Sequence, residues 1–202
     1  MDWTRTVHQT KLLILDLDET LIHANEGGLD RDPDFEVGPY AVYKRPGLDG
    51  FLAAIKPYFD VAVWTSSTRL YAAPVVASIF PSDFELKFVW SRERCTMRFD
   101  PEHHDYEWAK NLGKLKRRGY RLEQVLMVDD TPAKLSKHYG NLVRVRPFLG
   151  DPADQELAQL GVYLPTLVDV PNVRKVEKRF WRKANAVALQ PFGREDSACG
   201  SA

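Results

Sequence analysis

Residues 12–21 read LLILDLDETL, four apolar residues followed by two aspartates one residue apart. A short continuous apolar run of this kind is typical of a strand buried on both faces of a parallel sheet. Asp16 and Asp18 then stand at the carboxyl end of the strand, where ligands bind in open α/β sheets. The stretch therefore predicts a buried strand and the position of a functional site.

Four more apolar runs follow along the chain, with helical patterns between them. The expected strands are residues 12–15, 61–64, 86–90, 125–128 and 142–145. The expected helices are residues 46–55, 70–80, 106–118 and 132–138, a helix ending near residue 160, and an amphipathic helix over 172–183. Strands that alternate with helices favour an α/β fold with a Rossmann-like, mostly parallel sheet flanked by helices.

Residues 26–45 interrupt this alternation. The short apolar stretches 35–37 and 40–43 flank a Gly-Pro turn and predict a small β-hairpin inserted after the first strand. We expect residues 1–190 to form a single domain with this insertion and no large cap domain. Residues 191–202 are rich in Gly and Ser and are expected to be a flexible tail.

The composition argues against several functional classes. The chain has 202 residues with 28 Lys plus Arg and 28 Asp plus Glu, so its formal net charge is zero. General nucleic-acid binders and polybasic membrane binders usually carry a positive excess. The sequence has no run of 18 uncharged apolar residues that would predict a transmembrane helix, and its 2 cysteines favour a reducing compartment. We expect a cytoplasmic protein, or a nuclear one in a eukaryote, with no membrane or nucleic-acid partner; its oligomeric state stays open.

Polar residues gather at three of the expected strand ends. Asp16 and Asp18 follow the first strand, Thr65 follows the second, and the pair Asp129 and Asp130 follows the fourth. Because the carboxyl ends of parallel strands lie at one edge of the sheet, these side chains are expected to converge on one site. Oxygen ligands at this density suit Mg²⁺.

Aspartates at strand ends can also have a purely structural role. A lone aspartate at a strand end is more often a turn former or a helix N-cap than a functional group. Two acidic pairs at separate strand ends are harder to explain in this way than a lone aspartate, because clustered buried carboxylates repel one another unless a cation neutralises them. We therefore interpret the cluster as functional.

The first motif resembles that of a known superfamily. DLDETL at 16–21 resembles the first motif of the haloacid dehalogenase superfamily of phosphohydrolases. Glu19, where most of that superfamily has glycine, and the following Ile22 and His23 look like one branch of it. That branch comprises the RNA polymerase II C-terminal-domain phosphatases and the nuclear-LIM-interactor-factor-like phosphatases.

The remaining motifs follow in the order that the superfamily has. WTSS at 64–67 is similar to the second motif, and VDDTPA at 128–133 is similar to the fourth. The third motif is a lone lysine, which we match to Lys110, with Lys134 as the alternative because it follows the acidic pair. Signalling receivers use similar residues, but they place the acidic pair first and the lysine last.

The resemblance implies a catalytic role for four residues. Asp16 would attack phosphorus and form an aspartyl-phosphate. Asp18 would protonate the leaving oxygen and later activate water, from the same side of the chain as Asp16 because Leu17 points the other way. Thr65 would hydrogen-bond the phosphoryl group, and Lys110 would offset the negative charge.

The resemblance also implies the Mg²⁺ ligands. Asp16, Asp130 and the backbone carbonyl of Asp18 would bind the ion, and Asp129 would support the site from alongside. Ser66 of the second motif, together with Arg92 and Arg98, completes the set as candidates for binding the substrate phosphate.

The lengths of the insertions bear on the substrate. Thr65 follows Asp18 by 47 residues, and Lys110 follows Thr65 by 45. In each interval, one helix and one strand of ordinary length take about 25 to 30 residues, which leaves about 20 for an insertion. The remainder is too short for a closing cap, so we expect an open site that admits phosphoserine or phosphothreonine of a protein. A small-molecule phosphatase and a non-catalytic phosphoprotein-binding scaffold remain as alternatives.

Overall fold

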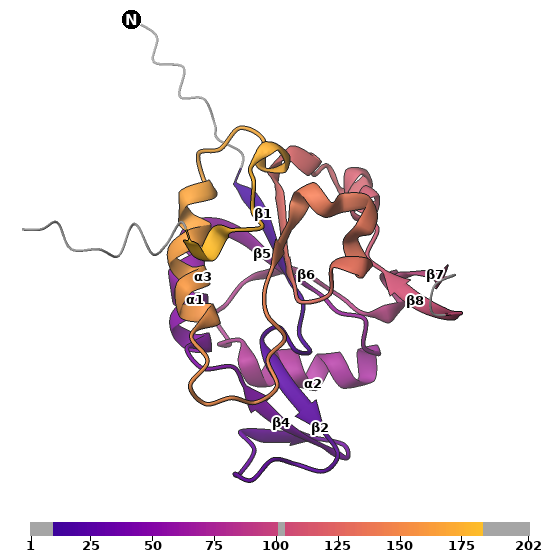
Figure 1. Ribbon diagram of the computed structural model, residues 1–202, viewed down its shortest axis with the longest axis vertical. Helices are drawn as coiled ribbons and strands as arrows, with labels where there is room; N and C mark the ends of the chain where they lie inside the picture. Colours follow the sequence, from indigo (N-terminus) through magenta and orange to yellow (C-terminus); the bar gives the residue numbers. More distant parts are fainter. Residues whose placement is uncertain (1–9, 101–103, 184–202) are drawn as a thin grey trace, which may run out of the picture.

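A five-stranded parallel sheet forms the centre of the molecule (Figure 1). Its strands are β1 (Lys11–Leu15), β5 (Phe59–Trp64), β6 (Leu86–Trp90), β9 (Val125–Asp129) and β10 (Leu142–Arg144). Their spatial order is β10-β9-β1-β5-β6, and every neighbouring pair is parallel. The expected α/β fold is confirmed, and each expected strand is present within about two residues of its predicted bounds.

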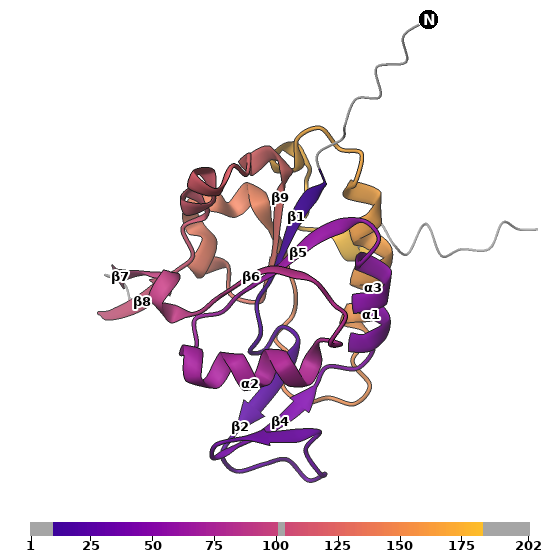
Figure 2. The ribbon, with the colours of Figure 1, turned by 180° about the vertical axis from the view of Figure 1, so that it is seen from behind.

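Both faces of the sheet are covered, which explains why most residues of its strands are apolar. Leu13 and Leu15 face the three α-helices, which are α1 (Leu48–Ile55), α2 (Arg69–Ile79) and α3 (Glu156–Tyr163). Alternate residues point to opposite faces, so Leu12 and Ile14 face the 3₁₀ segments η2 (Leu112–Arg118), η3 (Leu122–Gln124) and η4 (Pro132–Asn141). Figure 2, seen from behind, shows α2 crossing in front of the region between the sheet and the lobe below it.

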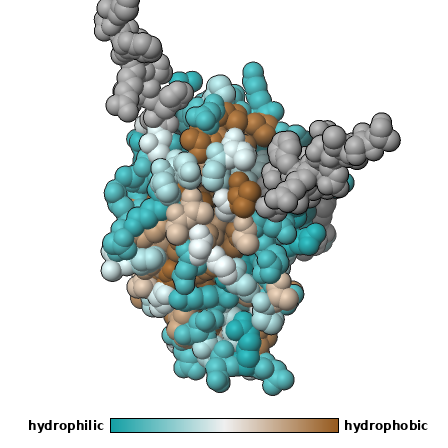
Figure 3. Space-filling view, turned by 90° about the vertical axis from the view of Figure 1, so that its left-hand side faces the viewer, coloured by the Kyte–Doolittle hydropathy of each residue, from teal (hydrophilic) through white to brown (hydrophobic). Residues whose placement is uncertain are grey.

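A small antiparallel sheet forms a lobe beyond the carboxyl ends of the central strands (Figure 1). It consists of β2 (Ile22–Asn25), β3 (Phe35–Val37) and β4 (Tyr40–Lys44) in the order β2-β4-β3. The expected hairpin is therefore present, but the lobe begins at Ile22 rather than at residue 26, because residues 22–25 pair with residues 41–44. Its surface is largely hydrophilic (Figure 3).

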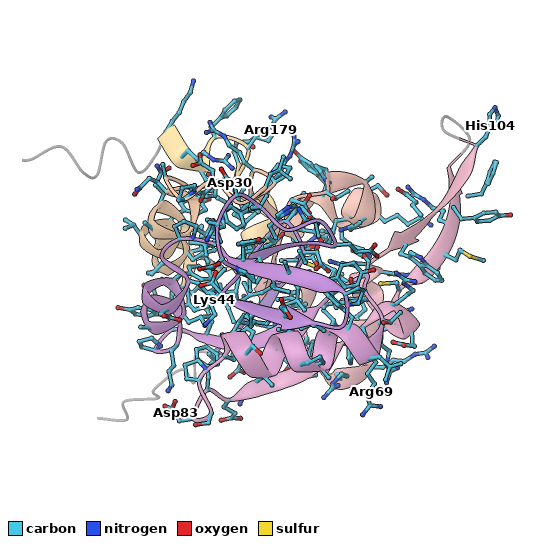
Figure 4. The ribbon with its side chains drawn as sticks, turned by 90° about the horizontal axis from the view of Figure 1, so that it is seen from below. Asp30, Lys44, Arg69, Asp83, His104 and Arg179 are labelled. Carbon is cyan, nitrogen blue, oxygen red and sulfur yellow. The ribbon has the colours of Figure 1, made fainter. Side chains whose placement is uncertain are left out.

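The predicted helix over residues 106–118 is wrong in its first part. The strands β7 (Thr96–Asp100) and β8 (Asp105–Ala109) pair as an antiparallel hairpin, and the chain becomes helical only in η2. Large side chains pair across the hairpin, with Phe99 opposite Tyr106 and Met97 opposite Trp108. These cross-strand contacts outweigh the weak helical periodicity of the segment. The hairpin projects from the sheet, and His104 marks its tip (Figure 4).

The predicted amphipathic helix over residues 172–183 is also wrong. The chain forms one 3₁₀ turn, η6 (Val173–Lys175), and becomes helical again only at residues 181–183. Lys178 turns inward and donates to the carbonyls of Val173 (2.5 Å) and Val176 (2.9 Å). This buried ammonium group uses carbonyls that an α-helix would pair with backbone N–H groups. The two remaining 3₁₀ turns are η1 (Arg92–Arg94) and η5 (Leu164–Leu167).

The computed structural model describes residues 10–100 and 104–183. The tail expected at residues 191–202 lies outside these ranges. Within them, the helices are all too short or too polar to span a membrane.

Candidate active site

Three strand ends meet at the edge of the central sheet. Asp16 follows β1 directly, and its backbone N–H bonds to the carbonyl of Val128 at 3.0 Å, so it continues the pairing of β1 with β9. Asp129 ends β9, and Thr65 follows β5 with its N–H bonded to the carbonyl of Trp90 at 2.9 Å. The convergence expected from the sequence is therefore present in the fold.

A buried lysine joins two of the carboxylates. Lys110 Nζ lies 2.8 Å from Asp16 Oδ1 and 2.7 Å from Asp129 Oδ2, and all three side chains are buried. Burial alone raises the pKa of Asp16, but the charges of Lys110 and Lys134 outweigh it and hold that pKa below its ordinary value. Burial, followed by the charge of Asp16, raises the pKa of Asp129 to about 6. The arrangement keeps Asp16 ionised.

Both candidate lysines reach the site. Lys134 Nζ lies 3.3 Å from Asp16 Oδ2, and its side chain is 22% exposed, whereas that of Lys110 is fully buried. Lys110 does not lie on a helix as expected; it follows β8, and its N–H donates to the carbonyl of Lys134 at 2.7 Å. The two positions offered as alternatives are thus adjacent, with Lys110 fixed between carboxylates and Lys134 closer to solvent.

The Asp18 carboxylate has its own set of donors. Its Oδ2 accepts from Ser67 Oγ at 2.7 Å and from Thr65 Oγ1 at 3.5 Å, and its Oδ1 accepts from Tyr71 OH at 2.7 Å. Burial and the charge of Asp18 raise the pKa of Tyr71, so its hydroxyl keeps its proton. The loop after β5 and the first turn of α2 therefore hold the Asp18 carboxylate.

Three carboxylates form a cluster that suits a divalent cation. One oxygen each of Asp16, Asp129 and Asp130 lies within 4.8 Å of the others. Asp130 Oδ1 is buried and accepts no hydrogen bond from any described residue. A buried carboxylate oxygen without a donor, beside two further carboxylates, fits the all-oxygen ligand set of Mg²⁺. The side chain of Asp18, bonded to Tyr71 and Ser67, is not part of this cluster.

The three candidates for substrate binding differ in their surroundings. Arg92 lies beside the loop after β5, where its Nε donates to the carbonyl of Ser66 at 2.7 Å. Ser66 Oγ is buried, with the Cys95 thiol as its neighbour and no further hydrogen-bond partner among the described residues. Arg98, on β7, is instead bonded to Glu107 of β8 and to Ser136 Oγ of η4, and it makes no contact with the carboxylates among the described residues. Arg92 and Ser66 therefore suit the expected role better than Arg98.

Two residues near the site were missed by the sequence analysis. No motif points to Tyr71, which meets Asp18 because α2 follows the loop after β5, the strand that pairs with β1. Glu19 was noted only as a departure from glycine; its φ of 57° is left-handed, a conformation that costs a non-glycine residue about 1 kcal/mol or more. Burial and the charge of Asp18 raise the pKa of Glu19 to about 7.

Comparisons with known proteins agree with this geometry. A family model described as NLI interacting factor-like phosphatase matches residues 11–174. The probable C-terminal domain small phosphatase of Dictyostelium discoideum is 32% identical over 174 residues, which cover 82% of this chain and 53% of that protein. CTD nuclear envelope phosphatase 1 of Xenopus laevis is 28% identical over 184 residues, covering 84% of this chain and 72% of that protein.

Solved structures share the fold. The fission yeast RNA polymerase II CTD phosphatase Fcp1, bound to beryllium fluoride, superposes with a TM-score of 0.52 at 20% identity, covering 89% of this chain and 50% of that one. The chain also spans only part of its curated relatives, with 53% of the Dictyostelium protein and 31% of CTD small phosphatase-like protein 1 of Caenorhabditis elegans. The family match covers most of the chain and includes all four motifs. The chain therefore belongs to the NLI interacting factor-like phosphatases, the branch of the haloacid dehalogenase superfamily that its motifs resemble.

Proposed function

We propose that this protein is a Mg²⁺-dependent phosphatase that hydrolyses phosphoserine or phosphothreonine of a protein through an aspartyl-phosphate on Asp16. The observation that carries the proposal is the Asp16 carboxylate, which is 1% exposed and contacted by Lys110 on one oxygen and by Lys134 on the other. A nucleophilic carboxylate must be ionised and fixed in place, and both conditions are met here.

The first step transfers the phosphoryl group to the protein. An oxygen of Asp16 forms a bond to phosphorus while the bond from phosphorus to the serine oxygen breaks. Asp18 gives its proton to that leaving oxygen, and Ser67 and Tyr71 hold the Asp18 carboxylate during the transfer. Lys110 and the N–H groups of the loop at Thr65 offset the charge of the phosphoryl oxygens.

The second step returns the enzyme to its starting state. Water attacks phosphorus and loses a proton to Asp18, while the bond from Asp16 to phosphorus breaks and inorganic phosphate leaves. Mg²⁺ held by Asp16, Asp130 and the carbonyl of Asp18 would supply positive charge to the phosphoryl group in both steps. Asp129 would keep Lys110 in place, which its 2.7 Å contact supports.

Several features support a protein substrate. The insertions are a three-stranded lobe and one hairpin, and neither resembles a closing cap in size. Arg92 stands at the loop after β5, where it could meet a phosphate approaching from solvent. The relatives named above are called C-terminal domain or nuclear envelope phosphatases, names that are compatible with a protein substrate.

The decisive experiment compares phosphoserine peptides with a panel of phosphorylated metabolites, each with Mg²⁺ and with EDTA. We expect peptide turnover that EDTA abolishes and that Asp16→Asn removes while the circular dichroism spectrum is retained. Full activity of the variant, or of the wild type in EDTA, would refute the phosphatase mechanism. A metabolite with a much higher kcat/KM than any peptide would make the protein a small-molecule phosphatase. Peptide binding without turnover would make it a scaffold.

A further inference from the structure

A basic hollow lies along the edge of the central sheet, outside the site described above. It has a volume of about 820 Å³ and is bounded by β10, by the end of η4 and by the segment after η6. Arg179 lies on its rim, on the side of the molecule opposite α2 (Figure 4). The hollow is thus built from two segments, residues 139–147 and 174–182, that are brought together by the fold.

Most of the polar groups around this hollow are cationic. Some already have partners, since Arg182 pairs with Glu156, Arg179 pairs with Glu177, and Lys178 is buried against backbone carbonyls. Four cations remain exposed around the hollow with no ion pair or side-chain hydrogen bond to any described residue. They are Arg144, Arg146, Arg174 and Lys175.

This concentration contrasts with the balanced composition of the chain. The whole chain has a formal net charge of zero, whereas seven Lys or Arg side chains and one acidic side chain, Glu177, line the hollow. Like charges held around a hollow repel one another, and a concave surface focuses their field on whatever enters. Three of the four are arginines, whose planar donors match two oxygens of a phosphate at once.

The basic hollow begins beside the catalytic strand ends. Arg144 is the register partner of Asp129, and the N–H of Val145 bonds to the carbonyl of Asp129 at 3.2 Å. β10 lies two strands from β1, or about 10 Å at the usual strand spacing. An extended peptide advances about 3.3 Å per residue, so about three residues separate a phosphate at Asp16 from one at Arg144. The three residues of β10 add about 10 Å, so about six residues reach the far end of the hollow.

We propose that the basic hollow binds a second phosphate group of the same substrate, about three to six residues from the phosphoresidue that is hydrolysed. This inference rests on the proposed function and makes the preferred substrate a multiply phosphorylated protein segment. RNA fits the hollow less well, because Tyr139 is the one aromatic side chain that lines it, whereas single-stranded nucleic acid needs several rings for stacking.

Binding can be measured without turnover in the Asp16→Asn background. The probes are fluorescein-labelled peptides with one phosphoserine, or with a second phosphoserine three to six residues away on either side. We expect the best doubly phosphorylated peptide to bind about tenfold more tightly than the peptide with one phosphoserine. This difference corresponds to the lower end of the free energy that a hydrogen bond to a charged group contributes. The double variant Arg144→Ala, Arg174→Ala in the same background should lose that preference and keep its affinity for the peptide with one phosphoserine.

Control variants distinguish a specific phosphate-binding site from a general effect of positive surface charge. Lys116→Ala with Arg117→Ala removes two exposed cations on η2 and should keep the preference. Lys175→Glu provides a single-residue test should the double variant fold poorly. Equal affinity for both peptides, or an equal loss in the η2 variant, would overturn the proposal. So would a higher affinity for an RNA oligonucleotide or for phosphatidylserine vesicles that depends on Arg144 and Arg174.

The outcomes also separate this inference from the proposed function. An otherwise wild-type protein carrying Arg144→Ala and Arg174→Ala should hydrolyse p-nitrophenyl phosphate at an unchanged rate. Normal turnover without a preference for the second phosphate would defeat the inference alone. A preference for the second phosphate in a protein without turnover would defeat the phosphatase mechanism and leave the phosphate-binding hollow in place.

Discussion

Lys134 Nζ lies 3.3 Å from Asp16 Oδ2, on the opposite carboxylate oxygen from Lys110. The same ammonium group is 3.9 Å from an oxygen of Asp129 and 3.9 Å from an oxygen of Asp130. Lys134 therefore reaches all three carboxylates that suit a divalent cation. The charges of those carboxylates keep Lys134 protonated by raising its pKa, although burial alone would lower it.

Replacing Lys134 by methionine should increase the affinity for Mg²⁺. The ammonium group and the metal ion compete for the same oxygens, so its removal leaves the carboxylates with more unbalanced negative charge. We expect the dissociation constant for Mg²⁺, measured by isothermal titration calorimetry, to be about tenfold lower in the variant. The effect is limited to this size because the Lys134 side chain is partly exposed and can move towards solvent when the ion binds to the wild type. Lys137→Met, an exposed lysine on the same segment, is the control and should change nothing. Weaker Mg²⁺ binding by Lys134→Met would show that this lysine assists the metal site instead.

Asp18→Asn should separate the two steps of the reaction. Nitrophenolate leaves without a proton, whereas a serine alkoxide needs one, and general acid–base help is worth about 10² to 10⁴ in rate. With p-nitrophenyl phosphate at saturating Mg²⁺, we expect a burst of up to one equivalent per enzyme followed by slow turnover. Mass spectrometry should then find one phosphoryl group that hydroxylamine removes. If both substrates slow by the same factor and no phosphoenzyme accumulates, Asp18 only organises the metal site.

Tyr71→Phe should impair the acid–base role of Asp18 without affecting substrate binding. The variant removes one donor to the Asp18 carboxylate, at 2.7 Å, and a hydrogen bond to a charged group is worth about 1.5 to 3 kcal/mol. We expect kcat for a phosphoserine peptide to fall about tenfold, with KM unchanged and a shifted pH profile. Tyr58→Phe, at an exposed and distant tyrosine, is the control. A change confined to thermal stability would limit Tyr71 to a packing role.

The buried pair of Asp16 and Asp129 predicts a pH dependence of stability. The pKa of Asp129 is about 6 in the folded protein against 3.8 ordinarily, so between these values the folded state binds more protons than the unfolded state. Stability from this group is therefore lost as pH rises from about 4 to about 6, by up to 2 to 3 kcal/mol. In EDTA, Asp129→Asn should flatten this part of the stability profile in thermal melts. A constant difference between wild type and variant across the range would contradict the shift.

The positions of the clustered carboxylates could be predicted from the sequence because their placement depends on local order. A short apolar run is typical of a parallel strand buried on both faces, and Asp16 and Asp129 come directly after two such runs. Parallel strands point their carboxyl ends the same way, so residues distant in sequence had to meet at one edge of the sheet. The same argument placed Thr65.

Other features were decided only by the tertiary structure. Residues 105–109 form a strand because they pair with β7, which the local sequence does not predict. Lys110, expected on a helix, therefore follows the second strand of a hairpin. The contact between Tyr71 and Asp18 spans 53 residues, and the one between Lys134 and Asp16 spans 118. No local periodicity encodes such contacts, because they depend on how strands, loops and helices pack around the shared sheet. The sequence by itself therefore determined which strand ends bring their polar side chains together, while packing decided which side chains fix, neutralise and surround the carboxylates there.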